Sequence, residues 1–288
     1  HLEKAEKAAE KLGCAAFCDV DQLLSEEDLG GIIVTSETVL HSRLVPHIVR
    51  TRKPVFIEKP LGMGMADAEE MGELLENACI PFQTGYFMRG FSNYRTIKKW
   101  VEEGKFGKIT RMRFSNCHSG ALGGWFDEEW RWMADLSQAG VGAFGDLGTH
   151  GLDILMWLGG GVKEAVGFRS YGTARYPNCD ELGEALLVFE NGIIATLAAS
   201  WDDWADPVKF QITGTEGAAW IIDNKLYAKF GEEVGEVPAE KLEPEVPAGF
   251  AAFLDFMEGK QAEMVEVKDA VSRCVVMDRI YRYSEPIG

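Results

Sequence analysis

The sequence has 288 residues, of which 46% are hydrophobic and 26% charged, the balance of a globular protein with room for two domains. Its formal net charge of −17 makes nucleic acid and anionic membrane surfaces poor partners, because the excess carboxylates repel phosphate groups. No apolar run approaches the ~20 residues that span a bilayer, and we expect no signal peptide, so the predicted location is the cytoplasm.

The first part of the chain, residues 1–86, predicts helices that alternate with short apolar strands. Strands are expected near 14–18, 31–35, 54–58 and 81–84, and helices near 2–12, 20–24, 41–50 and 66–79. Continuous apolar runs such as Val55-Phe56-Ile57 indicate strands that helices cover on both faces, and therefore a parallel sheet. We predict a doubly wound α/β domain of the Rossmann type.

This first domain is expected to be incomplete at its N-terminus. The sequence begins with His1, and the helix that follows has the pattern of a helix from the middle of a domain. We therefore interpret the sequence as part of a longer chain.

The pattern changes in the second part, residues 87–288, where alternating strands with one wetter face become frequent. Strands are expected at 108–115, 184–190, 193–200, 208–213 and 218–223, and helices at 93–103, 144–158, 249–258 and 268–283. Residues 232–247, rich in Pro and Glu, predict a surface loop or an edge hairpin. This pattern predicts an α+β domain with an open, mainly antiparallel sheet and helices on one face.

Six cysteines are spread over the chain without a CxxC pair or any spacing that suits zinc. We expect reduced and mostly buried thiols.

Charged residues follow a buried strand in the run Glu58-Lys59-Pro60. Ligands of open α/β sheets bind at the carboxyl ends of the strands, so these side chains are expected to face a cofactor and a substrate. The alternative is an ordinary pair of charges at a strand end on the surface.

A second polar group lies on the apolar helix expected at 144–158. At ~100° per residue, Asp146, His150 and Asp153 share one face of that helix. Two carboxylates beside an imidazole can hold its tautomer and raise its basicity, as a general base requires. The alternatives are a structural histidine and part of a metal site, but no second His/Glu cluster is present and no metal is expected.

A third group begins with Arg89, just past the last parallel strand, where a guanidinium could hold hydroxyls or a phosphate. Trp125, Trp130, Arg131 and Trp132 follow, ahead of Gly140-Val141-Gly142. Aromatic rings stack on sugar C–H faces, although tryptophans more often belong to a core or an interface.

Taken together, these motifs resemble the Gfo/Idh/MocA family of oxidoreductases, named for glucose–fructose oxidoreductase and inositol dehydrogenase. The likeness covers nearly the whole chain and rests on Thr35-Ser36 with His41, Glu58-Lys59-Pro60, Gly85 to Arg89, Trp130-Arg131, Asp146-x3-His150-x2-Asp153, Asn191-Gly192 and Gly214-Thr215-Glu216-Gly217. The combination of Glu-Lys-Pro with Asp-x3-His, in this order, is its most specific part.

The resemblance implies NAD or NADP as cofactor and a sugar, inositol or related polyol as substrate. Lys59 would hold the reacting oxygen, His150 would be the general base and Asp146 would bind a neighbouring hydroxyl. Arg89 and Asp153 would contact or support the substrate. The cofactor side would be lined by Thr35, His41, Glu58, Met88 and Arg131.

The resemblance also implies a cis Lys-Pro bond and a homodimer or homotetramer formed by the open sheet face. The family's first strand, the G-x-G-x-x-G turn that follows it and the residue that reads the ribose are absent, which leaves NAD against NADP undecided. Ser36-Glu37 stands where the family often has Pro-Asn.

The leading hypothesis is an enzyme that transfers a hydride between a nicotinamide and a hydroxyl carbon of a sugar or polyol. A glycosidase that uses NAD for transient oxidation on the same fold is one alternative. A non-catalytic sensor of nucleotides or sugars is another.

Overall fold

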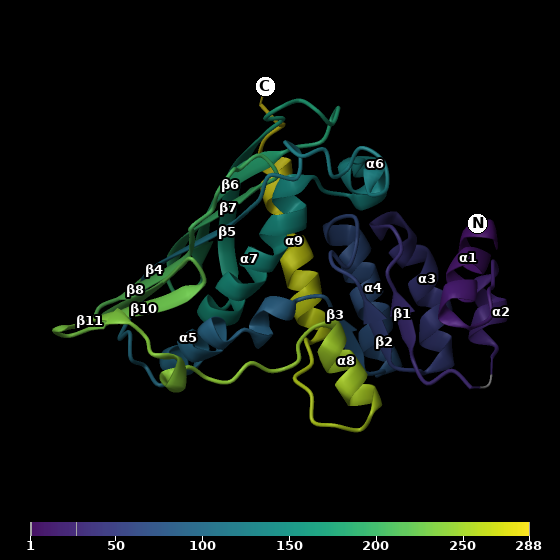
Figure 1. Ribbon diagram of the computed structural model, residues 1–288, viewed down its shortest axis with the longest axis horizontal. Coiled ribbons are helices and arrows are strands. Elements are labelled where there is room, and N and C mark those ends of the chain that lie inside the picture. Colours follow the sequence, from purple (N-terminus) through teal and green to yellow (C-terminus); the bar gives the residue numbers. More distant parts are fainter. Residues whose placement is uncertain (1, 27, 288) are drawn as a thin grey trace.

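The computed structural model describes residues 2–26 and 28–287. It contains a small sheet and a large sheet, and α7 (Ala143–Gly159) and α9 (Val267–Tyr283) lie between them (Figure 1). Both helices touch the large sheet, and α9 also packs along α4 (Met65–Ala78) of the small one.

The small sheet contains three short parallel strands in the order β1 (Ile32–Val34), β2 (Val55–Ile57) and β3 (Phe82–Thr84). The other helices of this part are α1 (Leu2–Leu12), α2 (Val20–Leu24) and α3 (His41–Ile48). Every residue of β2 is fully buried, as a strand covered on both faces must be. The predicted Rossmann-type parallel sheet is confirmed.

The prediction of a strand near 14–18 is wrong, because this segment is irregular and largely exposed. A strand needs a neighbour for its backbone hydrogen bonds, and within residues 2–26 and 28–287 no strand pairs with it. Cys14, Cys18 and Cys79 are exposed, and only Cys179 and Cys274 are buried. The expectation of mostly buried thiols is therefore also wrong.

The large sheet has eight strands in the order β11-β10-β9-β8-β4-β7-β6-β5. Their bounds are β4 (Ile109–Cys117), β5 (Val162–Ser170), β6 (Leu182–Phe189), β7 (Ile194–Ser200), β8 (Val208–Gly214), β9 (Gly217–Ile222), β10 (Lys225–Phe230) and β11 (Glu233–Glu236). Neighbours are antiparallel except for β4 and β7. The predicted mainly antiparallel sheet is confirmed, and β11 completes an edge hairpin in the stretch expected to be a loop or a hairpin.

The sequence analysis missed β5 and β10. Strand β5 lies at the edge of the sheet, and several of its side chains are charged and exposed, which breaks the alternation of apolar residues. Strand β10 is six residues long, and only Leu226 is fully buried.

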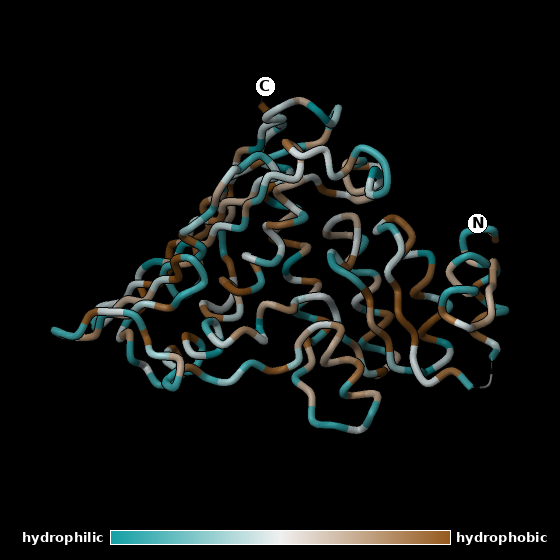
Figure 2. Tube along the Cα trace, in the orientation of Figure 1, coloured by the Kyte–Doolittle hydropathy of each residue, from teal (hydrophilic) through white to brown (hydrophobic). Residues whose placement is uncertain are grey.

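Helix α7 packs closely against the inner face of the large sheet. A Cβ atom at Gly151 would lie 2.6 Å from Cδ1 of Phe114, so a larger residue there would push the helix away from β4. The outer face of this sheet stays open, with Phe168, Leu186 and Ile194 exposed. In Figure 2, hydrophobic residues recur along the strands of the large sheet.

The C-terminal helices return to the small sheet. The ring of Phe56 in β2 packs 5.3 Å from Phe250 and 6.0 Å from Phe253 of α8 (Phe250–Met257), and Cys274 of α9 belongs to the same core as β2. The two parts expected at 1–86 and 87–288 thus share buried surface. Among the described residues, no helix is long and apolar enough to cross a membrane.

Shorter elements complete the fold. They are α5 (Ser92–Glu102), α6 (Leu136–Ala139) and the 3-10 helices η1 (Thr38–Leu40), η2 (Val49–Thr51), η3 (Phe87–Gly90), η4 (Arg131–Ala134) and η5 (Ala239–Lys241).

Candidate active site

Lys59 connects the small sheet to α7. It lies two positions after Ile57, the last residue of β2, and the Lys59–Pro60 peptide bond is cis. Its Nζ lies 2.8 Å from Oδ1 of Asp146 and 3.3 Å from the Asp146 carbonyl oxygen. Both side chains are 15% exposed. The fold therefore brings together two predicted residues that are 87 positions apart.

The first turn of α7 is anchored by side chains from other elements. The amide N–H of Phe144 donates to Oδ2 of Asp180 (2.9 Å), and that of Gly145 donates to the hydroxyl of Tyr281 (3.0 Å). Residues 140–145 have the spacing G-x-G-x-x-G, but their helix N-terminus is occupied by these groups. The run therefore positions α7 and does not offer its amides to a phosphate.

Asp146 lies in this first turn and is held on both carboxylate oxygens. Oδ2 accepts a hydrogen bond from Nε1 of Trp201 (3.3 Å), and Oδ1 faces the ammonium of Lys59. Burial raises the pKa of Asp146, but the charge and hydrogen bond of Lys59, with weaker help from Trp201, outweigh it and leave the pKa below its usual value. The carboxylate is ionised at neutral pH.

His150 lies one turn further along α7 and is 7% exposed. The rings of Phe87 and Tyr86 pack edge-on against it at 5.0 and 6.3 Å, and its Nδ1 is buried with no hydrogen-bond partner among the described residues. Burial, reinforced by the charge of Lys59, lowers the pKa of His150 to about 3, although Asp146 opposes the shift. The imidazole is neutral, so one ring nitrogen can accept a proton.

The two aspartates of α7 do not hold the imidazole as expected. Neither Asp146 nor Asp153 forms a hydrogen bond with His150, because each carboxylate instead meets cations from other elements. That part of the prediction is wrong. Bonds between charged partners are stronger than bonds from a carboxylate to a neutral imidazole.

Arg89 and Asp153 belong to a separate buried ionic cluster. Arg89 donates Nε and Nη2 to the two oxygens of Asp153 (2.8 and 2.5 Å) and Nη1 to Asp269 (3.1 Å). Arg273 of α9 adds a bond from Nε to Asp153 (3.0 Å) and another from Nη1 to Asp269 (3.1 Å). This cluster joins η3, α7 and α9, and the guanidinium and carboxylate groups expected to contact a substrate face one another.

Two of the expected cofactor residues follow β1, Thr35 directly after the strand and His41 as the first residue of α3. Thr35 is exposed. His41 is 1% exposed, with Nδ1 3.1 Å from the Leu61 carbonyl oxygen and Nε2 3.3 Å from that of Ser36. Burial lowers the pKa of His41. It therefore connects the loops that follow β1 and β2, and its ring nitrogens are directed at protein carbonyls.

The other three expected cofactor residues have different surroundings. Glu58 accepts a bond from the Lys59 amide (3.1 Å) and lies so close to Gly85 that a Cβ there would come within 2.4 Å of its Oε2. Met88 packs against the core of the large sheet. The guanidinium of Arg131 lies 5.3 Å above the ring of Tyr176.

A cavity of about 780 Å³ opens beside Asp146. It is lined by His118, Gly124, Trp125, Phe126, Asp127, Glu128, Glu129, Trp130, Met133 and Asp146. We refer to it as the Asp146 cleft. The rings of His118 and Trp125 stack at 4.8 Å, and the amide of Gly120 donates to Nδ1 of His118 (2.9 Å).

The sequence analysis missed both His118 and Trp201. Each directly follows a strand of the large sheet, β4 and β7 respectively, and these two strands are parallel neighbours. Functional residues are expected at the carboxyl ends of parallel strands, which is where His118 and Trp201 lie. The sequence does not show that β4 and β7 pair in parallel, so it could not predict these two residues.

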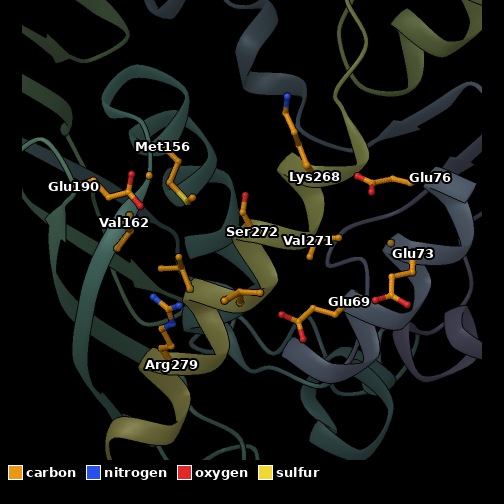
Figure 3. A pocket seen from close by; sticks show the side chains of 14 residues that line it. Glu69, Glu73, Glu76, Met156, Val162, Glu190, Lys268, Val271, Ser272 and Arg279 are labelled. Carbon is orange, nitrogen blue, oxygen red and sulfur yellow. The ribbon is translucent and has the colours of Figure 1, made fainter.

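A second cavity of about 670 Å³ lies between α4, α9 and β5 (Figure 3). Glu69, Glu73 and Glu76 project from one side, and Lys268 and Arg279 from α9. None of the predicted site residues lines it. In residues 2–26 and 28–287, no three His, Cys, Asp or Glu side chains come close enough to hold a metal ion.

Profiles of known families match most of the chain. Residues 1–86 match the profile described as "Oxidoreductase family, NAD-binding Rossmann fold", and residues 94–220 match the "GFO/IDH/MocA C-terminal domain".

Several curated proteins are similar to the chain. It is 27% identical over 226 residues to the 2,7-anhydro-N-acetylneuraminate hydratase of Escherichia coli (strain K12), covering 76% of this chain and 58% of the relative. It is 28% identical over 165 residues to the myo-inositol 2-dehydrogenase of Thermotoga maritima, covering 57% of this chain and 46% of the relative. The matched part thus spans about half the length of these relatives.

Solved structures share the fold. A levoglucosan dehydrogenase in complex with NADH and levoglucosan has a TM-score of 0.82 at 20% identity, covering 98% of this chain and 85% of that one. An aldose-aldose oxidoreductase from Caulobacter crescentus, complexed with glycerol, has a TM-score of 0.81 at 20% identity, with coverages of 98% and 87%. With both domain profiles matched in order and this fold, the chain belongs to the Gfo/Idh/MocA family of oxidoreductases.

Proposed function

We propose that this protein is an NAD(P)-dependent oxidoreductase that moves a hydride between a nicotinamide and a hydroxyl carbon of a sugar, inositol or related polyol. The observation that carries the proposal is the ion pair of Lys59 with Asp146 at the carboxyl edge of the parallel sheet, with a neutral His150 on the same face of α7 as Asp146. Relatives named as an inositol dehydrogenase and a 1,5-anhydro-D-fructose reductase support the substrate class.

The carboxyl edge of the small sheet fits a nicotinamide dinucleotide. The hydroxyls of Ser36 and Thr84, at the ends of β1 and β3, are buried without a hydrogen-bond partner among the described residues. Such hydroxyls can bond to a polar ligand. We propose that Thr35, Glu58, Met88 and Arg131 line the cofactor and that His41 shapes the loop beside it. The bound nicotinamide supplies the hydride acceptor.

The chain's own residues would handle the proton and the alcohol. We assign to His150 the removal of the hydroxyl proton, which passes to a ring nitrogen as the C–H electron pair leaves with the hydride. The ammonium of Lys59 would hold the reacting oxygen and stabilise its developing negative charge. Asp146 would hold Lys59 in place and accept a bond from a neighbouring hydroxyl. Arg89 and Asp153 would support this arrangement by fixing η3 against α7.

A second candidate is a reaction on the same fold without net oxidation, in which the hydride is returned to the substrate. The relative named as a hydratase favours it, because hydration changes no net oxidation state. An NAD-dependent glycosidase would be of this type. A non-catalytic sensor has no use for a neutral buried base beside a lysine, and we do not favour it.

We further propose a cytoplasmic homodimer or homotetramer of chains with domains at 1–86 and 87–288. The exposed Phe168, Leu186 and Ile194 on the outer face of the large sheet support this assembly, since exposed large apolar side chains are often covered by a partner in an interface. Light scattering of the purified protein measures the assembly, and a monomer would contradict it.

The test is a panel of sugars, inositols and polyols incubated with NAD or NADP, followed through the absorbance of the reduced nicotinamide. We expect reduction with at least one cyclic polyol or sugar. If the substrate is transformed while no reduced nicotinamide accumulates, the second candidate replaces the first. If no panel member is transformed and none reoxidises NADH or NADPH, the catalytic proposal fails.

A further inference from the structure

The Asp146 cleft carries an uneven distribution of charge. Four carboxylates line it, and two of them are neutralised, Asp146 by Lys59 and Asp127 by Arg175 at 2.9 Å (Nε to Oδ1). The other two project from the segment that leads into η4.

These two, Glu128 and Glu129, are exposed and have no ion-pair partner within residues 2–26 and 28–287. The described lining contains no lysine or arginine. Burial lowers the pKa of its one imidazole, His118, although Asp146 opposes the shift, so this ring is neutral at pH 7. The unbalanced charge on the wall of the cleft is therefore about two negative charges.

Aromatic side chains form the rest of the wall. Trp125 is 56% exposed and stacks one side of its ring on His118, and Trp130 is 51% exposed. Exposed indole rings in a cleft suit the C–H faces of a sugar ring, which are apolar and uncharged.

We propose that the Asp146 cleft accepts uncharged and cationic sugars and rejects sugars that carry a carboxylate or phosphate. This inference rests on the proposed function for its reaction but not for its binding test. Two exposed carboxylates on the wall repel an anionic sugar and leave a neutral one unaffected. At low ionic strength we expect an uncharged sugar to bind about tenfold more tightly than an anionic one. Added salt should reduce this ratio, because the Debye length is about 10 Å at 0.1 M.

Binding of seven probes to the protein tests the proposal. Glucose, galactose and mannose are each compared with the corresponding uronate, which replaces the hydroxymethyl group by a carboxylate, and glucosamine supplies a cation. Dissociation constants come from the quenching of tryptophan fluorescence at 10 and 300 mM salt. We expect each bound neutral hexose to bind about tenfold more tightly than its uronate at low salt and about threefold at high salt. Glucosamine should bind at least as tightly as glucose.

The variant that locates the effect is Glu128→Gln with Glu129→Gln. It should lower the ratio between hexose and uronate to near one at low salt. Glu73→Gln with Glu76→Gln is the matched control, since it removes the same charge from the cavity of Figure 3 and should keep the ratio.

The outcomes separate this inference from the proposed function. Uronates that bind as tightly as hexoses, a ratio unchanged by the Glu128/Glu129 variant, or no binding by any neutral hexose would overturn the inference. Hydride transfer between a uronate and the nicotinamide, with hexoses and uronates bound equally tightly, would support the proposed function and contradict the inference. Tighter binding of hexoses than of uronates, with no hydride transfer between any sugar and the nicotinamide, would support the inference and contradict the proposed function.

Discussion

Helix α7 contributes to two buried ionic groups, which differ in whether their polar atoms have partners. Asp153 lies in a cluster where Arg89 and Arg273 balance its charge and that of Asp269, and its side chain is 2% exposed. Asp146 and its partner Lys59 are each 15% exposed, and Asp146 shares a face of α7 with His150, whose Nδ1 has no partner in the described part of the chain.

The difference indicates what each group is for. A buried network whose charges are balanced by one another stabilises a fold and offers a ligand little. A buried polar atom without a partner costs free energy, so its presence calls for an explanation such as a ligand or a catalytic role. By this comparison the Asp153 cluster is structural, and the Lys59–Asp146–His150 group is where chemistry would take place.

The largest expected effect comes from removing the reactive groups. His150→Ala and Lys59→Ala should each lower kcat by about 10²–10⁴, because each removes a group that moves a proton or stabilises charge in the transition state. Lys268→Ala, at a lysine 73% exposed on the far side of α9, should keep kcat. Steady-state kinetics on the best panel substrate measures this. Equal kcat for the His150 and Lys268 variants would show that His150 takes no part in the reaction.

The structural cluster should respond in stability. Arg273→Met leaves Asp153 and Asp269 short of a cation in a buried site, and we expect a loss of about 3–5 kcal/mol in the free energy of unfolding. Arg282→Ala, which breaks an exposed pair with Asp278, should cost about 0–1 kcal/mol. Urea denaturation compares the two. A cost for Arg273→Met no larger than that of Arg282→Ala would show that the cluster is not structural.

The hydrogen bond from Trp201 to Asp146 is expected to contribute to the reaction rate. Trp201→Phe keeps the buried ring among Phe126 and Tyr176 but removes the N–H bonded to Asp146. We expect about a fivefold fall in kcat, the equivalent of the ~1 kcal/mol that such a bond contributes. The acid limb of the pH–rate profile should also move upward, because the Asp146 carboxylate loses a donor. Trp220→Phe, at the far end of the sheet beside Tyr227, should change neither.

A further effect concerns pH and stability. His150 has a pKa of about 3 in the folded chain and about 6.5 when unfolded, so only the unfolded chain binds the proton between these values. Its contribution to stability is present above pH 6.5 and falls by about 1.4 kcal/mol per pH unit below it. His150→Gln should therefore lose less stability than the parent between pH 6 and 4.5. Identical slopes in urea denaturation would contradict the low pKa.

Local patterns predicted most of the fold. A continuous apolar run located β2, because burial on both faces favours apolar residues. Strand β1 is apolar although Ile33 is exposed, and β3 contains the buried polar residues Gln83 and Thr84. The edge strand β5 was not predicted, and the strand predicted near 14–18 is absent. Pairing with a neighbour, and not local composition, decides whether such segments form strands.

For the site, the sequence by itself determined which side chains exist and on which face of α7 they lie. Helical spacing places Asp146, His150 and Asp153 together, and strand ends place Lys59 and Arg89 at the edge of the parallel sheet. Only the tertiary structure decided the pairing, Asp146 with Lys59 and Asp153 with Arg89 and Arg273. Charge partners come from elements far apart in the chain, and burial, which lowers the pKa of His150, arises only when those elements pack.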